Sequence, residues 1–261
     1  MDDIGALKQE VARLQAELAE TRAVSRQYLQ NVAHQLTAPL GAIKWSIEAL
    51  KDERVPLSRK KALLSSVYSQ ATILVHLIKN FTLLSNLEAD HELGQFREKP
   101  EQENILRLAI NLANDFQPQA YEQGIKIVVD NDSFRKVFGS NCLLIEKNLV
   151  AQAISNILEN AVKYAYQDSM INVFAASSSD HVGICIESVG IPIPEADKKQ
   201  VFSRGFRGAS ARQKVAAGTG FGLYLASRVM TFHEGQIDLH TEGKTSRFFL
   251  LFPRKRLSRE K

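Results

Sequence analysis

The sequence predicts two domains: an antiparallel helical hairpin that dimerises into a four-helix bundle, and an α+β domain that follows it. Three observations predict this fold class. Apolar residues recur at alternating spacings of three and four through residues 1–90, as they do along helices that pack on a seam. That spacing stops around Gly94 and Pro100, which mark a linker. Beyond Pro100, helical stretches alternate with stretches of period two, which are typical of strands.

The first helix is expected to run from the N-terminus to about Asp52. Its apolar residues fall into two seams. The first seam is formed by Ile4, Leu7, Val11, Leu14 and Leu18, and the second by Leu29, Ala33, Leu36, Leu40, Ile43, Ile47 and Leu50. The step between the seams is one heptad plus four residues, a stutter that changes the phase of a coiled coil. We therefore expect one long helix, in which residues 1–24 form a coiled-coil signal helix that continues into the hairpin.

The second helix of the hairpin is expected after Pro56, which blocks continuation of the first helix. Ser58 is a suitable N-cap. The seam of this helix is formed by Leu64, Val67, Ala71, Leu74, Ile78 and Phe81. Two antiparallel helices bury only part of such apolar faces, so dimerisation into a four-helix bundle is the natural completion. We assign residues 25–90 to this dimerisation domain and residues 91–100 to the linker.

The remaining chain is expected to fold as one α+β domain over residues 101–253. Helices are predicted over residues 103–123, 146–165 and 218–234, and strands at residues 125–129, 171–175, 182–186, 237–239 and 247–252. Residues 254–261 are expected to form a solvated basic tail, because they hold five basic residues and one acidic residue.

Composition narrows the classes of function. The chain has 33 basic and 29 acidic residues, and the C-terminal tail alone accounts for the net charge of +4, so a basic face for nucleic acid is not expected. Two cysteines exclude a disulfide scaffold. The uncharged stretches 27–43 and 62–78 carry too many polar residues to span a membrane, and no signal peptide opens the chain. We therefore expect a cytoplasmic protein without a membrane span.

His34 is the first residue whose context suggests chemistry. It lies one residue past the seam position Ala33, about 100° around the helix from the buried face, so its imidazole should be exposed. Pro39 lacks the amide hydrogen that would bond the carbonyl of Gln35, which should bend the helix just beyond His34. A neutral imidazole can attack phosphorus at physiological pH. From this context alone, a nucleophile and an ordinary exposed histidine are equally open interpretations.

A second candidate site lies on the helix predicted over residues 146–165. Asn156, Asn160 and Lys163 are spaced four and three residues apart, which places them on one helical face. Amide oxygens suit Mg²⁺, and a lysine suits a phosphate group. The opposite face is apolar, so a plain solvent-exposed polar face is the alternative interpretation.

A third candidate is the glycine-rich stretch from Gly218 to Gly222, directly before a helix. Alternate glycines let backbone amides approach phosphate oxygens closely, and the N-terminus of the helix favours an anion. No βαβ unit surrounds the stretch, which disfavours a dinucleotide site of the Rossmann type. The preceding segment is typical of a mobile basic lid over a polyphosphate, with the charges Arg204, Arg207, Arg212 and Lys214.

Five motifs in order resemble those of one family. They are HQLTAPL from His34 (an H-box), NILENAVKY from Asn156 (an N-box), ESVGIPIPEAD from Glu187 (a G1 box), VFSRGFRG from Val201 (an F-box) and GTGFGL from Gly218 (a G2 box). Together they resemble the catalytic core of sensor histidine kinases of two-component signalling. The resemblance implies a dimerisation and histidine phosphotransfer domain, followed by an α/β-sandwich ATP-binding domain of the Bergerat type, the HATPase domain.

The resemblance also implies ATP and Mg²⁺ as cofactors, with His34 attacking the γ-phosphorus and Gln35 beside it in a catalytic role. Asn160 would bind Mg²⁺ with Asn156 in support, and Lys163 would contact the phosphates and act in catalysis. The other implied ATP contacts are Tyr164, Ser188, Gly190, Arg204, Arg207, Gly218, Thr219, Gly220, Gly222, Leu223 and Thr245. The phosphoryl group of His34 would pass to an aspartate on the receiver domain of a response regulator.

Four positions depart from the pattern that the family usually shows. Gln35 stands where an acid normally follows the histidine, and Ala38 where Thr or Asn normally supports dephosphorylation of the partner. Ser188 replaces the aspartate that normally accepts a hydrogen bond from adenine, and Pro192 replaces the second glycine of its loop. The leading hypothesis is an active protein-histidine kinase that autophosphorylates His34. The alternative is a catalytically weak or inactive dimeric scaffold that regulates a response regulator or another kinase.

Overall fold

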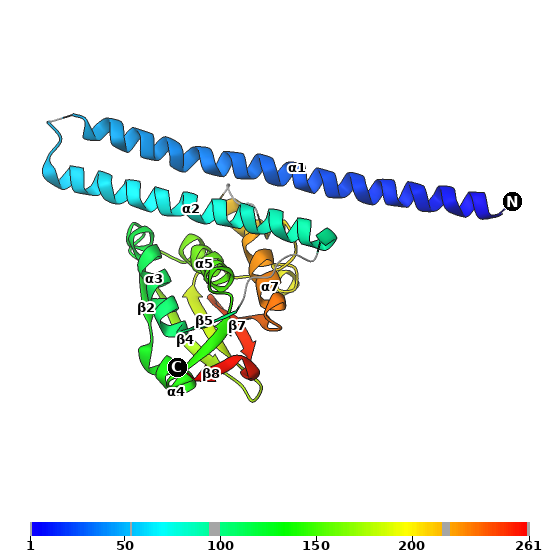
Figure 1. The fold of residues 1–261 in the computed structure, drawn as a ribbon. Coiled ribbons are helices and arrows are strands. Elements are labelled where there is room, and N and C mark those ends of the chain that lie inside the picture. Colours follow the sequence, from blue (N-terminus) through cyan, green and yellow to red (C-terminus); the bar gives the residue numbers. More distant parts are fainter. Residues whose placement is uncertain (1, 53, 94–99, 216–219, 260–261) are drawn as a thin grey trace.

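The computed structural model describes residues 2–52, 54–93, 100–215 and 220–259. Figure 1 shows two parts: a long helical hairpin, and an α/β domain that lies against the second helix of the hairpin. No helix within these described ranges is long and apolar enough to cross a membrane.

The hairpin consists of α1 (Asp2–Leu50) and α2 (Leu57–Leu93), two antiparallel helices joined by a short connection that contains Pro56. α1 runs unbroken through both apolar seams, which confirms the prediction of one helix across the stutter. The predicted N-cap at Ser58 is wrong, because α2 begins one residue before it. The amide of Lys60 donates to the carbonyl of Pro56, so the first turn of the helix is built on the backbone of the proline itself.

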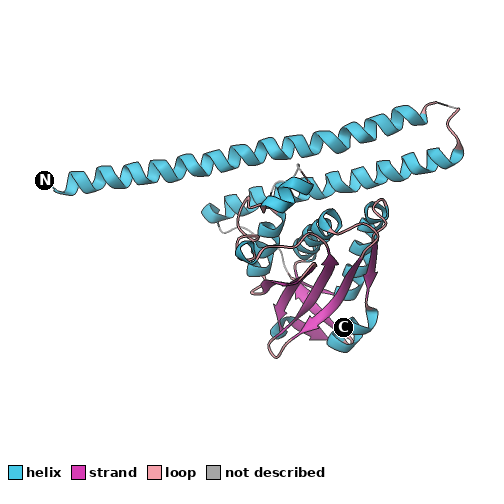
Figure 2. Cartoon of the chain, turned by 180° about the vertical axis from the view of Figure 1, so that it is seen from behind, coloured by secondary structure: helices cyan, strands magenta, loops and turns pink. Residues whose placement is uncertain are grey.

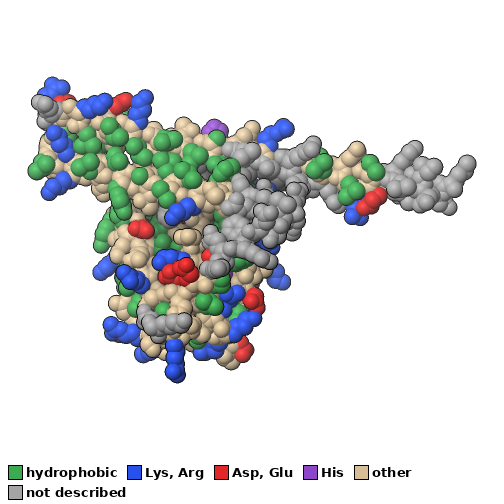
Figure 3. Space-filling view, in the orientation of Figure 1, with side chains coloured by type: hydrophobic (Ala, Val, Ile, Leu, Met, Phe, Trp, Pro, Cys, Tyr) green, Lys and Arg blue, Asp and Glu red, His purple; other side chains and the backbone are tan. Residues whose placement is uncertain are grey.

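Large apolar side chains remain exposed along the hairpin. We call the following set the hairpin stripe: Leu40, Trp45 and Ile47 of α1, and Leu57, Leu64, Tyr68, Val75, Ile78 and Phe81 of α2. Figure 3 shows hydrophobic side chains gathered over this part of the surface. One hairpin therefore leaves much of its apolar surface uncovered, as expected for one half of a four-helix bundle.

The α/β domain is built on a five-stranded sheet with the order β2-β4-β5-β7-β6. The strands are β2 (Lys126–Val129), β4 (Met170–Ser177), β5 (His181–Val189), β7 (Thr245–Pro253) and β6 (Gln236–Glu242). β2 and β4 are parallel, and the other neighbouring strands are antiparallel. Three helices pack on the sheet, as Figure 2 shows from behind: α3 (Ile105–Tyr121), α5 (Lys147–Tyr164) and α7 (Gly222–Phe232).

The core lies between these helices and the sheet. α5 contributes Ile154 and Ile157, and the central strand β5 contributes Ile184 and Ile186, each at most 1% exposed. Full burial of such a side chain stabilises the fold by about 1.5–3 kcal/mol. Since this apolar face fixes the rotation of α5, it also fixes where the polar face of α5 points. The predicted helical hairpin followed by an α/β-sandwich domain is confirmed.

A short helix that the sequence pattern did not reveal follows β2. α4 (Asn131–Phe138) begins after Asp130, whose carboxylate accepts hydrogen bonds from two backbone amides of the first turn. It ends at Gly139, which has a positive φ of 57°. Phe134 and Phe138 bury its apolar side. The available sequence signal for this helix was an aspartate before it and a glycine after it, with eight residues between them.

The predicted basic tail is not free in solvent. Leu257–Arg259 form β8, which pairs antiparallel with β3 (Asn141–Ile145), and β3 pairs on its other side with β1 (Glu101–Glu103). Arg254 and Arg256 donate to backbone carbonyls of the domain. The prediction of a tail separate from the domain is therefore wrong over residues 254–259, because Arg254 and Arg256 are held by carbonyl groups and Leu257–Arg259 complete a small sheet.

His233, at the end of α7, makes stability depend on pH. It is 1% exposed, its Nε2 accepts the amide of Glu146 at 3.0 Å, and its Nδ1 lies 2.8 Å from the carbonyl of Val229. These contacts need a neutral ring that donates from Nδ1. Burial lowers the pKa of His233 below its usual 6.5, although the hydrogen bond to Val229 opposes the shift. Below about pH 6.5 the unfolded chain therefore binds a proton that the folded chain does not.

Above that pH, protonation of His233 costs no stability. As the pH drops from there toward the lowered pKa of His233, we expect the free energy of unfolding to fall. Urea titrations at a series of pH values check this. His233→Gln keeps an acceptor but cannot be protonated, so its profile should be flatter. The same slope in the variant as in the wild type would contradict the assignment.

Candidate functional site

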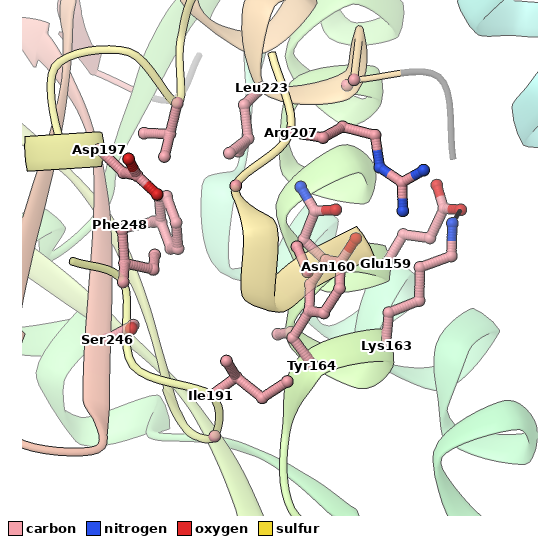
Figure 4. Close-up of a pocket in the computed structure, with 18 of the residues that line it drawn as sticks. Glu159, Asn160, Lys163, Tyr164, Ile191, Asp197, Arg207, Leu223, Ser246 and Phe248 are labelled. Atoms are coloured by element: carbon pink, nitrogen blue, oxygen red, sulfur yellow. Dashed lines mark hydrogen bonds and ion pairs between the residues drawn. The ribbon is translucent and has the colours of Figure 1, made fainter. Parts of the chain in front are cut away.

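A pocket opens between α5, the loop that follows β5, and the start of α7 (Figure 4). The predicted ATP contacts that line it are Asn156, Asn160, Lys163, Tyr164, Ser188, Gly190, Arg207, Gly220, Gly222 and Leu223. They come from segments far apart in the sequence, and the fold brings them to one cavity. Gly218 and Thr219 lie outside the described residues.

α5 supplies the polar wall of the pocket. Asn156 is 2% exposed, and Asn160 and Lys163 are half-buried. Their shared face is therefore not an ordinary solvent-exposed face, because it lines a cavity. Lys163 pairs with Glu159 one turn earlier, with 2.5 Å between Nζ and Oε1, and Figure 4 shows the two side chains meeting beside Arg207. Glu159 was not predicted as a site residue, and a bound anion would compete with it for the lysine.

The floor of the pocket lies where β5 ends and β7 begins. Ser188 and Ser246 are opposite each other in the register of these strands, and both are buried. The predicted contact Thr245 is not among the described residues that line the pocket, and Ser246 is. Side chains alternate between the two faces of a strand, so a shift of one residue changes the face. Ser246 shares its face with Phe248, which also lines the pocket, and that alternation was the missed signal.

Glu187, next to the serine that replaces the usual aspartate, is bound on the other face of the sheet. Its carboxylate accepts the side-chain amide of Asn172 at 3.0 Å and pairs with Arg247, with 2.6 Å between Nε and Oε2. Burial raises the pKa of Glu187, but these two hydrogen bonds and the positive charge of Arg247 outweigh it and lower the pKa below its usual value. Glu187 therefore stays ionised and engaged away from the pocket, so the polar group on the pocket side is the hydroxyl of Ser188.

A short lid helix, α6 (Ala209–Lys214), borders the pocket. Lys214 donates to the carbonyl of Ala165 at 2.6 Å and lies over the ring of Tyr166, which ties the end of the lid to the domain. Arg207, which precedes the lid, lines the pocket and donates to the carbonyl of Val215. The segment just before the lid helix therefore places a cation, Arg207, at the pocket wall.

Arg204 and Arg207 have different places, although the sequence offered both as phosphate ligands. Arg204 lies over the ring of Phe221, 5.6 Å from guanidinium carbon to ring centroid, and it is not among the described lining residues. Arg207 is the arginine in position to meet a phosphate group.

Two glycines permit close approaches that a side chain would block. Gly220 has a φ of 70°, and a Cβ there would lie 2.7 Å from the backbone of Gly205. A Cβ on Gly190 would lie 2.3 Å from the carbonyl of Tyr164. Both positions therefore require glycine, and backbone groups form the pocket wall there.

His34 lies on α1 with an exposed side chain, as predicted, and Pro39 is accommodated within the same helix. The side chain of Gln35 lies outside the described residues. His34 is not among the described residues that line the pocket. The candidate nucleophile and the candidate nucleotide site are therefore separate in this arrangement.

Two family models match the chain. Residues 24–90 match the His Kinase A (phospho-acceptor) domain, and residues 145–256 match the Histidine kinase-, DNA gyrase B-, and HSP90-like ATPase. The first contains His34, and the second contains the pocket wall on α5 and the start of α7. The chain contains the catalytic core of a histidine kinase.

This kinase core also resembles curated and solved histidine kinases. It is 27% identical over 240 residues to the sensor-like histidine kinase SenX3 of Mycobacterium tuberculosis, covering 92% of this chain and 56% of the relative. It is 38% identical over 120 residues to the sensor protein CzcS of Cupriavidus metallidurans, covering 45% of this chain and 25% of the relative. The chain thus spans about half the length of SenX3.

Solved structures share the fold. The histidine kinase AdeS of Acinetobacter baumannii matches with a TM-score of 0.53 at 18% identity, over 84% of this chain and 97% of that one. Full-length ShkA in complex with AMPPNP matches with a TM-score of 0.55 at 17% identity, over 87% of this chain and 45% of that one. At these identities the likeness concerns the fold.

Proposed function

We propose that the chain is an ATP-dependent protein-histidine kinase that autophosphorylates His34 and passes the phosphoryl group to an aspartate on a response regulator. The observation that carries the proposal is the pocket, which gathers amides, a lysine and close-packed glycines around one cavity. The match of residues 24–90 to a phospho-acceptor domain supports His34 as the acceptor. As an ATP-dependent enzyme serving a response regulator, the core would act in the cytoplasm.

The residues present suit Mg²⁺ and a nucleoside triphosphate. Asn160 offers a neutral oxygen ligand, with Asn156 in support, which suits a hard cation that keeps phosphates and waters as its other ligands. Lys163 and Arg207 would hold the phosphates, and the hydroxyls of Ser188 and Ser246 would face the base. When bound, Mg²⁺ would neutralise charge on the transferring phosphoryl group.

His34 would supply the nucleophile. One ring nitrogen attacks the γ-phosphorus with its lone pair, the bond from phosphorus to the bridging oxygen breaks, and ADP leaves. The proton on the other ring nitrogen must then leave the ring. Gln35 can orient the imidazole by hydrogen bonding but cannot accept that proton at neutral pH. Since His34 does not line the pocket, transfer requires either a movement of the α/β domain or the pocket of a second protomer.

The hairpin stripe supports a homodimer. A second copy would bury its exposed apolar side chains in a four-helix bundle. We expect the mass of a dimer by light scattering at micromolar concentration, and a monomer for Ile47→Asp, which places a charge in the stripe. Lys44→Ala, a change at a residue with a 79% exposed side chain, should remain dimeric. A monomeric mass for the wild type would refute the assembly.

The kinase proposal is tested by incubation with Mg·ATP that carries labelled γ-phosphate. We expect protein-bound label that is labile in acid and stable in base, as a phosphoramidate is, and no label from α-labelled ATP. Absence of γ-label on a folded, dimeric protein would refute the kinase and leave the scaffold hypothesis, in which the pocket serves binding only.

A further inference from the structure

The hairpin reaches the nucleotide pocket through α2, where Leu77 and Asn80 line it. Asn80 of α2 is among the residues that line the pocket, and its Nδ2 donates to Oδ1 of Asn156 at 2.7 Å. On its other side, Oδ1 of Asn80 accepts Nε2 of Gln152 at 2.9 Å. Asn156 and Gln152 belong to α5 and are 2% and 4% exposed. These three side chains form an amide relay that joins the hairpin to the wall of the pocket.

The relay leaves one polar atom of Asn156 unused. Its Nδ2 is buried and has no hydrogen-bond partner among the described residues. The amide is confined on a third side by the start of α7, because a Cβ on Gly222 would lie 3.5 Å from Asn156 Oδ1. An unpartnered buried donor is unfavourable, and a pocket that takes a metal would need an acceptor there instead.

Reversal of the relay supplies that acceptor. A carboxamide carries an oxygen on one side and an NH₂ group on the other, so turning all three amides by 180° keeps both hydrogen bonds. Gln152 then accepts from Asn80, and Asn80 accepts from Asn156. The carbonyl oxygen of Asn156 takes the place of the unpartnered Nδ2, and an amide oxygen is a ligand for Mg²⁺ whereas an NH₂ group is not.

We propose that Asn80 is a positioning residue for the magnesium of the bound nucleotide, so that the affinity for Mg²⁺ depends on docking of the hairpin. Asn80 holds the amide of Asn156 in its plane and, when reversed, directs the oxygen of Asn156 to the metal. The inference rests on the proposed function, since it requires that the pocket takes Mg²⁺ with a nucleotide. Movement of α2 away from α5 would remove this support and weaken the metal site.

Two substitutions at Asn80 separate positioning from simple docking. Asn80→Leu removes both hydrogen bonds at similar size, so the amide of Asn156 loses its orientation. Asn80→Asp introduces a group that only accepts. It can keep the bond from Gln152 and oblige Asn156 to donate through Nδ2, which fixes the amide of Asn156 with its oxygen pointing away from α2. A purely structural contact would be weakened by both changes.

The experiment is calorimetric titration of the full chain with a non-hydrolysable ATP analogue, with and without Mg²⁺. The quantity compared is the ratio of the two affinities. We expect Asn80→Leu to reduce the ratio roughly fivefold, the equivalent of one neutral hydrogen bond, and Asn80→Asp to keep or raise it. Thr72→Val, which removes a hydroxyl bonded only within α2, should leave the ratio unchanged. Thermal unfolding verifies that each variant is folded.

The possible outcomes distinguish failure of the positioning role from failure of the nucleotide site. A wild-type ratio in Asn80→Leu, or a loss in Asn80→Asp equal to that in Asn80→Leu, would overturn the positioning role while leaving the nucleotide site intact. If Asn80→Leu does not fold, the retained ratio of Asn80→Asp still decides. Failure of the wild type to bind the analogue more tightly with Mg²⁺ would refute the nucleotide site itself, and this inference with it.

Discussion

Gln35→Glu is expected to raise the rate of autophosphorylation about a hundredfold, the lower end of what general base catalysis contributes. The residue follows His34 directly, and an amide there can orient the imidazole but cannot take its proton. A carboxylate can do both. The rate is measured from the initial incorporation of labelled γ-phosphate at saturating Mg·ATP, so that a change in nucleotide affinity does not enter.

Two variants bracket this prediction. Gln35→Ala removes orientation without adding a base, so its rate should fall below that of the wild type. Gln35→Asp adds a base on a shorter side chain and should give a smaller gain than Gln35→Glu. An unchanged or lower rate in Gln35→Glu would show that proton removal does not limit the reaction. The scaffold hypothesis would then gain weight if the wild-type rate were itself close to zero.

Asn160→Leu is expected to lower the affinity for Mg·ATP about a hundredfold, at the upper end of what loss of a metal-site side chain costs. Asn160 offers an amide oxygen at the pocket wall, and leucine is close to it in size but offers no ligand. The affinity is measured by titration with a fluorescent ATP analogue in the presence of Mg²⁺. Metal-free binding should change much less, since the base and sugar contacts are untouched.

Asn148→Leu provides the matched control, because Asn148 lies on the same helix, is exposed, and borders a different groove between α2 and α5. Its affinity should equal that of the wild type. Equal affinity for Mg·ATP in Asn160→Leu and Asn148→Leu would remove Asn160 from the metal site.

The long, repetitive parts of the fold were predictable because their patterns are local. α1, α2 and α5 each repeat an apolar spacing over many turns, and that period specifies a helix without knowledge of its partner. Short elements were not predictable in this way. β8 is three residues long and exists because it pairs with β3, more than a hundred residues earlier in the sequence. The basic residues in and around it predicted a solvated tail, but its backbone pairs with β3 instead.

The site residues also fall into two groups: those that a local sequence pattern predicts, and those that depend on contacts between distant segments. Asn156, Asn160 and Lys163 share one face of a helix, so sequence spacing alone brought them together. Ser246 was missed by one position, since the face of β7 depends on its register with β5. Asn80 was missed entirely, because it is 76 residues from Asn156 and its role follows from how the hairpin packs on the domain.

The lining of the pocket also indicates what changes when Ser188 stands in place of the family's usual aspartate. Where an acid would accept a hydrogen bond from the base with charge assistance, this chain presents the two neutral hydroxyls of Ser188 and Ser246 on facing strands. A neutral hydrogen bond contributes about 1 kcal/mol and a charge-assisted one about twice that. If the base binds there as proposed, we expect weaker discrimination between adenine and guanine nucleotides, because a hydroxyl can donate as well as accept.

The proposed kinase activity requires that His34 receives the γ-phosphate of an ATP bound in the pocket of the α/β domain. Its most direct test is to incubate the chain with Mg·ATP, digest it at neutral pH or above to preserve phosphohistidine, and locate the phosphate by peptide mass spectrometry. We expect phosphate on His34 in the wild type and none in Asn160→Leu or in His34→Gln. Phosphate on a different residue, or on His34 at undiminished level in Asn160→Leu, would contradict it.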